Sequence, residues 1–474
     1  MKTLWATRNE TLSWKRSFVW LVMAVAGFQL AYSLKHPAAG VCIFGYVCGL
    51  IQLTDQPTIR RAFYFGLATA FLGYAPQLFF FYHIFSFAAI VLWIVLAFWV
   101  GLFSAIVWAG SRRWGRAKTF WLIPILWTGI EFFRSELYFL KFSWLNVGYV
   151  LSSVSARLGM YGAVFLIFAL AAILLNWRNL TKRSQAVLGL AILLAAALIL
   201  IPKEKPENAL KNAPAISLVG VQLEFPPESL IPRVLDQAYA KHPDANIFVL
   251  SEYTLNGGIP DALKNWCRKH QRYLVVGGKD FITNDIYYNT AFVVGTNGGI
   301  VFQQAKCVPI QFFNDGRPAR EQNVWHSPWG KIGLCVCYDL SYTRVTDKLI
   351  RQGAQLLIVP TMDVEYWGRR QHELHALVAP VRAAEYGVPI FRLCSSGISQ
   401  AVDATGNVIA SAPMPGNAAV MAARLRLPAR GHLPVDRWLA RGCAFATLML
   451  LAGHLFLTGK DRSNRLRTKS SNPE

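Results

Sequence analysis

The sequence predicts a membrane-embedded helical bundle joined to an α/β domain. The first observation is composition: 54% of the 474 residues are hydrophobic, with 16 Trp and 30 Phe, which is more apolar than a typical soluble chain. The second is a series of about eight apolar runs that suit the thickness of a bilayer. The third is a long segment, residues 203–438, in which short β-rich runs alternate with helical patterns.

Each predicted span is an apolar run close to the roughly 17–25 residues that a helix needs to cross a bilayer. The runs are 17–34, 38–53, 62–81, 88–109, 119–133, 158–177, 184–201 and 440–458. The first run is predicted to be an uncleaved span, because no small-residue cleavage site closes it and more spans follow directly.

Positive charge sets the predicted topology. The formal net charge is +22, and most of the excess Lys and Arg lies at the two chain ends and in short connections around residues 60–61, 112–118 and 178–183. Such residues favour the cytoplasmic side of a membrane, so both chain ends are predicted to be cytoplasmic and residues 203–438 to face outward. Because the charge marks topology and does not form one basic face, no nucleic-acid partner is predicted.

The predicted organisation therefore has three parts. Residues 1–202 form a seven-span membrane bundle, residues 203–438 form an extracytoplasmic domain, and residues 439–474 form a final span with a basic cytoplasmic tail. Within the outer domain, strands are predicted at 215–221, 246–250, 273–277, 291–295, 332–336, 356–360, 389–393 and 419–423, and helices at 228–241, 262–271, 345–352 and 372–386. Strands that alternate with helices predict a sheet buried on both faces.

Three reactive side chains follow strands in the outer domain. They are Glu252, Lys306 and Cys337. Taken singly, each has an ordinary structural explanation: a solvated loop carboxylate, a surface lysine and a small core residue. Together they supply a base, a charge that stabilises an oxyanion, and a nucleophile whose thiolate a nearby lysine favours. The sequence thus predicts covalent catalysis by these three residues.

Several short motifs accompany these residues. In the outer domain they are Val221-Gln222, Tyr288-Asn289-Thr290, Cys337-Tyr338-Asp339 and residues 382–389, with His375 seven positions before Arg382. In the bundle they are residues 131–134 and 142–149. The outer motifs resemble the nitrilase (carbon–nitrogen hydrolase) superfamily, and together with the bundle the chain is similar to the apolipoprotein N-acyltransferase family.

The resemblance implies an αββα sandwich for the outer, catalytic domain and a bacterial inner membrane as location. It also implies that Cys337 takes an acyl chain from a phospholipid as a thioester, and that the chain passes to the N-terminal amine of a lipoprotein bearing diacylglyceryl-Cys. No metal or other cofactor is implied. Contacts with the lipid substrates are expected from Tyr338, Asp339, Trp144, Glu131, Arg134 and His375.

Several positions depart from the family pattern. A second Glu that usually follows the catalytic Lys is missing, and Asp315 stands in that region as a candidate replacement. Asp339 replaces a Glu, no Trp occurs from 203 to 265, and Cys394-Ser395-Ser396 replaces an Asn pair. Three alternatives therefore stay open: another amine acceptor, a membrane-tethered amidase that uses water, and a non-catalytic scaffold. His372 and His375 lack the i, i+4 spacing of a zinc helix, so no metal site is predicted.

Overall fold

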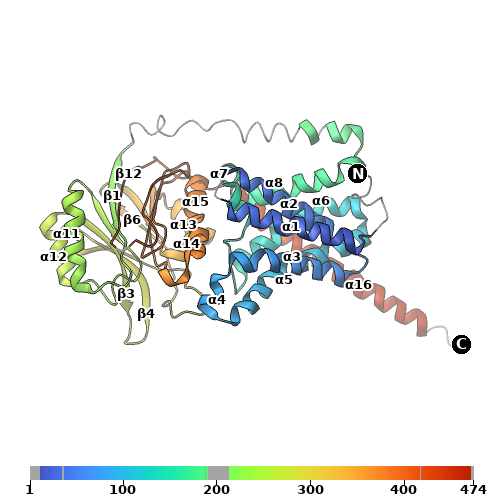
Figure 1. Cartoon of the computed structure of the whole chain (residues 1–474), viewed down its shortest axis with the longest axis horizontal. Coiled ribbons are helices and arrows are strands. Elements are labelled where there is room, and N and C mark those ends of the chain that lie inside the picture. Colours follow the sequence, from blue (N-terminus) through green and yellow to red (C-terminus); the bar gives the residue numbers. More distant parts are fainter. Residues whose placement is uncertain (1–10, 35–36, 187, 191–212, 417, 471–474) are drawn as a thin grey trace.

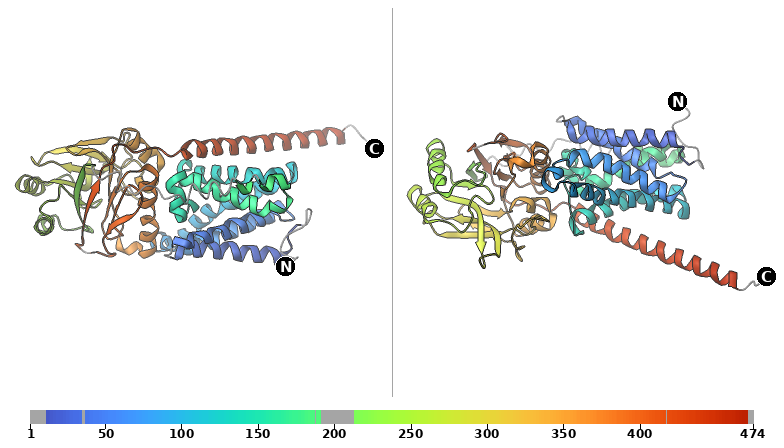
Figure 2. Two further views of the ribbon diagram at one scale, coloured as in Figure 1. Left: turned by 90° about the horizontal axis from the view of Figure 1, so that it is seen from above. Right: turned by 60° about the horizontal axis from the view of Figure 1, so that its bottom comes forward.

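The computed structural model describes residues 11–34, 37–186, 188–190, 213–416 and 418–470, and it places a helical bundle beside a two-sheet domain (Figure 1). The bundle contains α1 (Trp14–Ser33), α2 (Ile43–Leu53), α3 (Ile59–Gln77), α4 (Phe80–Phe85), α5 (Ala88–Trp114), α6 (Arg116–Phe132), α7 (Ser152–Leu158) and α8 (Met160–Asn176). The last helix, α16 (Asp436–Ser470), starts at the junction, runs along the bundle and extends past its far end (Figure 2).

By length and composition, two of the described helices could cross a membrane, Ala88–Trp114 and Met160–Asn179. The prediction of about eight spans stays a prediction, and the predicted run 184–201 lies largely outside the described residues. Two other predicted spans are interrupted. Residues 38–53 begin as a 3₁₀ helix (Pro37–Cys42) before α2, and residues 62–81 are divided because α3 ends just after Pro76.

The outer domain is built on two six-stranded sheets. The first has the order β12-β1-β2-β3-β4-β5 and the second the order β11-β10-β9-β8-β7-β6. In each sheet three strands run parallel, β1-β2-β3 and β7-β8-β9, and the outer strands pair antiparallel. The strands are β1 (Ala215–Val221), β2 (Ile247–Leu250), β3 (Tyr273–Phe281), β4 (Tyr287–Val294), β5 (Ile300–Ala305), β6 (Val324–Ser327), β7 (Gly330–Leu334), β8 (Leu356–Thr361), β9 (Ile390–Cys394), β10 (Gln400–Val402), β11 (Val408–Ser411) and β12 (Val420–Arg426).

Helices cover the outer faces of both sheets. In Figure 1, α11 (Ile231–Lys241) and α12 (Asp261–His270) lie on the side away from the bundle, whereas α13 (Thr343–Arg351), α14 (Arg369–Ala376) and α15 (Val378–Tyr386) lie between the second sheet and the bundle. Helix α11 buries Ile231, Val234, Leu235 and Ala238, the single face that its sequence spacing predicts. The predicted two-sheet nitrilase-like domain is confirmed.

Most predicted outer-domain elements lie within a few residues of those observed, but one helix differs. Residues 372–386 were expected to form a single helix, and the structure divides them at Leu377 into α14 and α15. Pro380 explains the break, because it has no N–H to donate to the carbonyl of Ala376 and its ring crowds that carbonyl. The sequence did not predict the short strands β6, β10 and β11, because three or four residues are too few to show an alternating pattern.

The bundle and the outer domain meet through a loop between α6 and α7. Within it, the Trp144 Nε1–H donates to Ser341 Oγ at 3.0 Å. The hydroxyls of Tyr338 and Tyr342 donate to the carbonyl of Lys141 at 3.2 and 3.3 Å. These contacts fix the bundle loop directly against the turn that follows Cys337.

Candidate active site

The three predicted catalytic residues meet at the carboxyl ends of strands. Glu252 follows β2, Lys306 follows β5 and Cys337 follows β7 by three residues. The Lys306 ammonium lies 2.9 Å from Glu252 Oε1. Met362 connects Glu252 with Cys337. Its N–H donates to Glu252 Oε2 at 2.7 Å, and its carbonyl oxygen lies 3.8 Å from Cys337 Sγ. All three side chains are buried.

The backbone at this site is strained. Cys337 has φ +51° and Tyr253, next to Glu252, has φ +55°, a region that non-glycine residues rarely adopt. Gly277 of β3 makes room for the turn at Glu252, because a Cβ there would lie 2.5 Å from the Glu252 Cα. Strain of this kind is held in place by surrounding structure and is common where a side chain must be aimed at a substrate.

Lys306 contacts a second carboxylate, that of Asp315, at 2.8 Å. Asp315 also accepts hydrogen bonds from the Tyr253 hydroxyl (2.8 Å) and the Ile310 N–H (2.8 Å). The Asn289 amide bridges the two acids, donating to Glu252 Oε1 at 2.6 Å and to Asp315 Oδ1 at 2.8 Å. Asp315 thus gives Lys306 a second carboxylate contact beside Glu252, and its role as the replacement for the missing Glu stays a prediction.

Burial controls the protonation of the site. It raises the pKa of the Cys337 thiol well above the usual value, Glu252 adds to the increase, and Lys306 offsets only part of it. Lys306 acts in the predicted direction and lowers the pKa of the thiol, but desolvation outweighs the lysine charge. Burial also raises the pKa of Glu252, while Lys306 acts in the opposite direction. Burial thus favours the neutral form of the Cys337 thiol.

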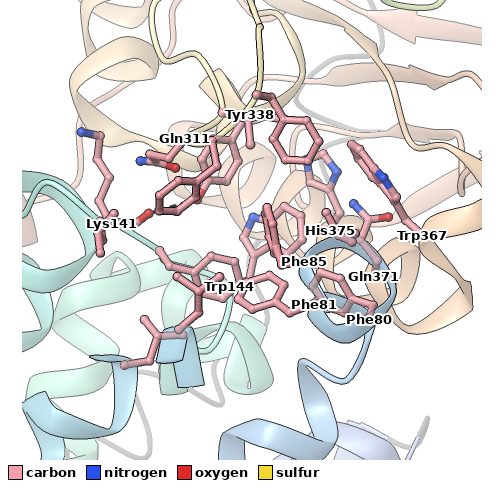
Figure 3. A pocket seen from close by; sticks show the side chains of 18 of the residues that line it. Phe80, Phe81, Phe85, Lys141, Trp144, Gln311, Tyr338, Trp367, Gln371 and His375 are labelled. Atoms are coloured by element: carbon pink, nitrogen blue, oxygen red, sulfur yellow. Dashed lines mark hydrogen bonds between the residues drawn. The ribbon is translucent and has the colours of Figure 1, made fainter. Parts of the chain in front are cut away.

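A pocket opens from Cys337 toward the bundle (Figure 3). It encloses about 820 Å³ of space, including its open mouth, and its walls come from both parts of the molecule. The bundle contributes Phe80, Phe81, Ile84, Phe85, Leu92, Val95, Leu96, Leu140, Lys141, Phe142 and Trp144. The outer domain contributes Ile310, Gln311, Phe312, Phe313, Cys337, Tyr338, Asp363, Trp367, Gln371 and His375. The site is thus an apolar, largely aromatic chamber with a thiol in its wall.

Three of the predicted substrate-binding residues line this pocket. Trp144 stacks on His375 with ring centroids 4.6 Å apart, and Tyr338 meets the Trp144 ring edge-on at 5.8 Å. His375 Nδ1 lies 2.9 Å from Asp363 Oδ1. Burial lowers the pKa of His375 to about 4, so its ring is neutral at pH 7.

The other three predicted residues lie behind the pocket wall. Asp339 accepts hydrogen bonds from the N–H groups of Cys307 (3.0 Å) and Val308 (2.7 Å), which anchors the loop after Lys306. Glu131 and Arg134 pair at 2.5 Å, and Arg134 donates to the carbonyl of Phe142 at 3.3 Å. All three are almost fully buried, and their roles toward substrate stay predictions.

Sequence reasoning gave no site role to Asp363 or Gln371. The Asp363 carboxylate has several partners: it accepts hydrogen bonds from Gln371 (2.9 Å) and Arg392 (2.5 Å) as well as from His375. Burial acts to raise the pKa of Asp363, but His375 and Arg392 hold it well below its usual value. The position of Asp363 two residues after β8 was the available signal, because the carboxyl ends of parallel strands meet at one edge of a sheet.

Comparisons with known proteins agree with this architecture. Residues 169–430 match the carbon-nitrogen hydrolase family, and residues 21–173 match the apolipoprotein N-acyltransferase N-terminal domain. The chain is 24% identical over 456 residues to an apolipoprotein N-acyltransferase of Geobacter metallireducens, covering 83% of this chain and 87% of that protein. A second apolipoprotein N-acyltransferase, from Shewanella oneidensis, is 23% identical and is covered over 80% of its length, with 78% of this chain.

Among solved structures, a carbon-nitrogen hydrolase from Helicobacter pylori G27 is 20% identical and covers 44% of this chain and 89% of its own, with a TM-score of 0.40. The match at residues 169–430 spans more than half of the chain. The chain therefore belongs to the carbon–nitrogen hydrolase family, in the branch that carries the apolipoprotein N-acyltransferase N-terminal domain.

Proposed function

We propose that this protein is a lipoprotein N-acyltransferase that works through a thioester on Cys337. The observation that carries the proposal is the aromatic pocket, because it connects the Cys337 thiol, which lies close to Glu252 and Lys306, to walls supplied by the helical bundle. A fatty acyl chain gains about 0.8 kcal/mol for each CH₂ that it buries. A hydrolase of small polar amides has no need of such a chamber.

In the first half-reaction, the substrate is a phospholipid. Glu252 takes the thiol proton while the Cys337 sulfur bonds to the acyl carbonyl carbon, and Lys306 stabilises the oxyanion. The ester C–O bond then breaks, and Glu252 gives its proton to the departing lipid oxygen. The products are a lysophospholipid and the acyl thioester, with Glu252 ionised again.

In the second half-reaction, the acceptor is the neutral α-amine of a lipoprotein with an N-terminal diacylglyceryl-Cys. Its nitrogen bonds to the thioester carbon, and Glu252 takes an N–H proton. The C–S bond breaks, and Glu252 returns the proton to the Cys337 sulfur. Both substrates carry acyl chains, which suits a site at the junction with a membrane bundle.

The proposal includes the membrane arrangement predicted from charge. Residues 1–202 would form the seven-span bundle, residues 203–438 the catalytic domain on the periplasmic side of a bacterial inner membrane, and residues 439–474 the last span and cytoplasmic tail. Helix α1 begins, and α16 ends, at the end of the bundle away from the catalytic domain, which supports a common side for the two chain ends (Figure 2).

The test uses the purified full chain in detergent with phosphatidylethanolamine and a synthetic diacylglyceryl-Cys peptide, followed by mass spectrometry of peptide and protein. The expected result is a peptide with one added amide-linked acyl chain and an acyl thioester on Cys337. The Cys337→Ala protein should give neither product. A thioester without peptide modification would exclude this acceptor, and full activity in Cys337→Ala would exclude the mechanism.

A further inference from the structure

Two buried acceptor atoms belong to side chains that line the pocket containing Cys337. Gln371 and His375 lie one turn apart on α14, with 2% and 1% of their surface exposed, and both line the pocket. Figure 3 shows them at the same wall, beside Trp367. Gln371 Oε1 and His375 Nε2 have no hydrogen-bond partner among the residues that the structure describes. A buried polar atom without a partner is costly, and it commonly marks the place of a ligand.

Asp363 determines which atoms these two side chains present to the pocket. Its Oδ1 accepts from Gln371 Nε2 and from His375 Nδ1, each at 2.9 Å. Gln371 must then turn its carbonyl oxygen away from Asp363. In the neutral imidazole, a proton on Nδ1 leaves Nε2 with a lone pair. Trp144 covers one face of the imidazole and thereby limits its rotation. The pocket therefore offers two fixed acceptors and needs a ligand with two donor hydrogens.

A primary amine is such a ligand. Phospholipid ester groups carry only acceptors, whereas the neutral α-amine of the acceptor carries two N–H groups on the atom that must reach the thioester. We infer that Gln371 Oε1 and His375 Nε2, oriented by Asp363, form the binding site for the acceptor's amino group. The inference rests on the proposed function and adds to it the residues that hold the acceptor's amino group.

The two residues act by positioning and take no proton. They receive hydrogen bonds from the amine before it attacks, and during attack one N–H proton passes to Glu252 and then to the departing Cys337 sulfur. Holding the nitrogen beside the thioester raises its effective concentration, which favours transfer over hydrolysis. The ammonium of a phosphatidylethanolamine head group has the same donor chemistry and is the competing source.

The test separates the half-reactions in the full-length protein, with phosphatidylglycerol as a donor that has no amine. Gln371→Met removes the Oε1 acceptor, together with the N–H group that donates to Asp363, at similar side-chain length. His375→Gln keeps a donor for Asp363 and an acceptor for the amine. Arg369→Gln, an exposed position on the same helix, is the matched control. Thioester formation on Cys337 and transfer to a primary-amine or an N-methylated acceptor peptide are followed by mass spectrometry.

In Gln371→Met we expect KM for the primary-amine peptide to rise about fivefold to tenfold, as for one lost hydrogen bond. Thioester formation should fall less than transfer does, so that the ratio of transfer to thioester formation decreases, and His375→Gln should retain most of the transfer. The unaltered protein should use the N-methylated peptide less well than the primary amine. That difference should shrink in Gln371→Met, a result that a general structural defect would not produce.

Three results would overturn the inference. If Gln371→Met slows both half-reactions equally, the role of Gln371 is structural. If the N-methylated peptide is disfavoured as strongly in Gln371→Met as in the unaltered protein, Gln371 does not accept a hydrogen bond from the amine. If Gln371→Met forms the thioester more slowly than the unaltered protein with phosphatidylethanolamine but not with phosphatidylglycerol, the site binds the lipid head group. If the unaltered protein makes no thioester or no amide, the proposed function itself fails, which is a separate outcome.

Discussion

Two carboxylates, those of Glu252 and Asp315, contact the ammonium of Lys306, and their different surroundings suit them to different roles. Glu252 faces both Lys306 and the thiol, so it can take the thiol proton. Asp315 also contacts Lys306 and is held by Tyr253 and Asn289. Asp315 therefore acts on the chemistry through charge, by keeping the lysine ionised and by making it harder for Glu252 to lose its own proton.

This division predicts a pH effect for Asp315→Asn. Burial first, and then the Asp315 charge, raises the pKa of Glu252, so removing that charge should lower this pKa. Glu252 must be ionised to act as base, and its ionised form exists above its pKa. The acidic limb of thioester formation should therefore move to lower pH in Asp315→Asn. The maximal rate should fall about tenfold to a hundredfold, as for a lost charged hydrogen bond.

Single-turnover rates measured across the acidic pH range check this prediction. Asp285→Asn, an exposed position in the hairpin between β3 and β4, is the matched control and should leave the profile in place. If the acidic limb of the rate profile stays in place or moves to higher pH in Asp315→Asn, the Asp315 charge does not raise the pKa of Glu252.

A second residue-level prediction concerns Gly277. A Cβ at this position would meet the Glu252 Cα and the Ser251 carbonyl oxygen at 2.5 and 2.7 Å, so Gly277→Ala must displace the turn that aims the base. Because general base catalysis typically contributes 10²–10⁴-fold, we expect thioester formation to fall by about a hundredfold. Gly258→Ala, with open space around its Cβ, should retain activity. Equal activity of the two variants would show that the turn tolerates the shift.

The residues differ in how far sequence could predict them. Glu252, Lys306 and Cys337 each follow a strand, and strand ends can be read from short apolar runs, so their meeting was predictable. Asp315 lies in a loop whose path depends on tertiary contacts with Lys306 and Tyr253. The sequence could therefore indicate Asp315 only as a candidate for the missing Glu, without predicting its contacts. Asp363 follows a strand and could have been considered on that signal, whereas Gln371 gains its relation to the site from its hydrogen bond to Asp363, which no local pattern reveals.

At the scale of elements, α4 and α5 decide the shape of the acyl pocket. The sequence predicted spans at 62–81 and 88–109, but α3 ends after Pro76 and the aromatic turn α4 follows on its own at the junction (Figure 1). Phe80 and Phe81 of α4 then line the pocket with Leu92 of α5. Hydropathy detects such a run as one continuous span, because a short helix with four aromatic residues is as apolar as the span before it.

The pocket walls predict control of acyl-chain length. Leu92 is half-buried and lines the pocket, so Leu92→Trp should fill part of the space that the chain occupies. Thioester formation from donors with sixteen-carbon chains should fall about tenfold, since about two CH₂ groups lose their burial, while eight-carbon donors react nearly as before. The measurement is the rate of thioester formation with matched phosphatidylglycerols of the two chain lengths.

Ile94→Trp provides the control, because Ile94 is exposed on the same helix and is not part of the pocket wall. It should leave the ratio of the two rates unchanged. If Leu92→Trp slows both donors equally, the chain does not lie along α5.

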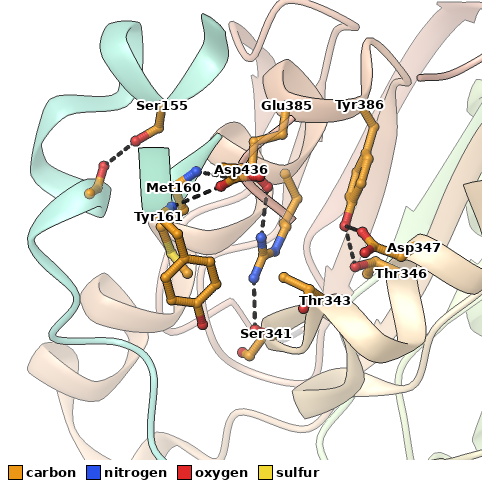
Figure 4. A network of polar contacts seen from close by, with 12 residues as sticks. Ser155, Met160, Tyr161, Ser341, Thr343, Thr346, Asp347, Glu385, Tyr386 and Asp436 are labelled. Carbon is orange, nitrogen blue, oxygen red and sulfur yellow. Dashed lines mark hydrogen bonds and ion pairs between the residues drawn. The ribbon is translucent and has the colours of Figure 1, made fainter. Parts of the chain in front are cut away.

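At the scale of the whole molecule, one buried polar network joins the bundle, the catalytic domain and α16 (Figure 4). The N-terminus of α8 is capped by two carboxylates: Glu385 accepts from the Met160 N–H at 2.5 Å, and Asp436 accepts from the Tyr161 N–H at 2.9 Å. Helix N-termini favour negative charge, so both contacts are stabilising. Gly159 permits this approach, because its φ is +79° and a Cβ there would collide with the Asp436 carboxyl group.

The same network reaches the turn that carries the nucleophile. Arg437 contacts Asp436 (2.8 Å) and Glu385 (3.3 Å), and Arg382 contacts Glu385 (2.7 Å) and donates to the Ser341 carbonyl at 2.9 Å. Ser341 ends the short 3₁₀ helix that begins at Cys337. The position of the thiol relative to the bundle wall of its pocket thus depends on charged side chains from α15 and α16 and on the N-terminus of α8.

This connection predicts that Asp436→Ala weakens both the fold and the chemistry. The substitution removes a helix cap and leaves Arg437 buried with one partner fewer, at a cost of about 2–4 kcal/mol. We expect a lower thermal unfolding midpoint in detergent and slower acylation from long-chain donors, because the pocket walls come from the two parts that Asp436 helps to hold together. The exposed Asp261 at the start of α12 is the control, and Asp261→Ala should change neither quantity. An unchanged midpoint in Asp436→Ala would show that the apolar contacts at the junction suffice, whereas a lower midpoint with normal acylation would separate the stability of the junction from the shape of the pocket.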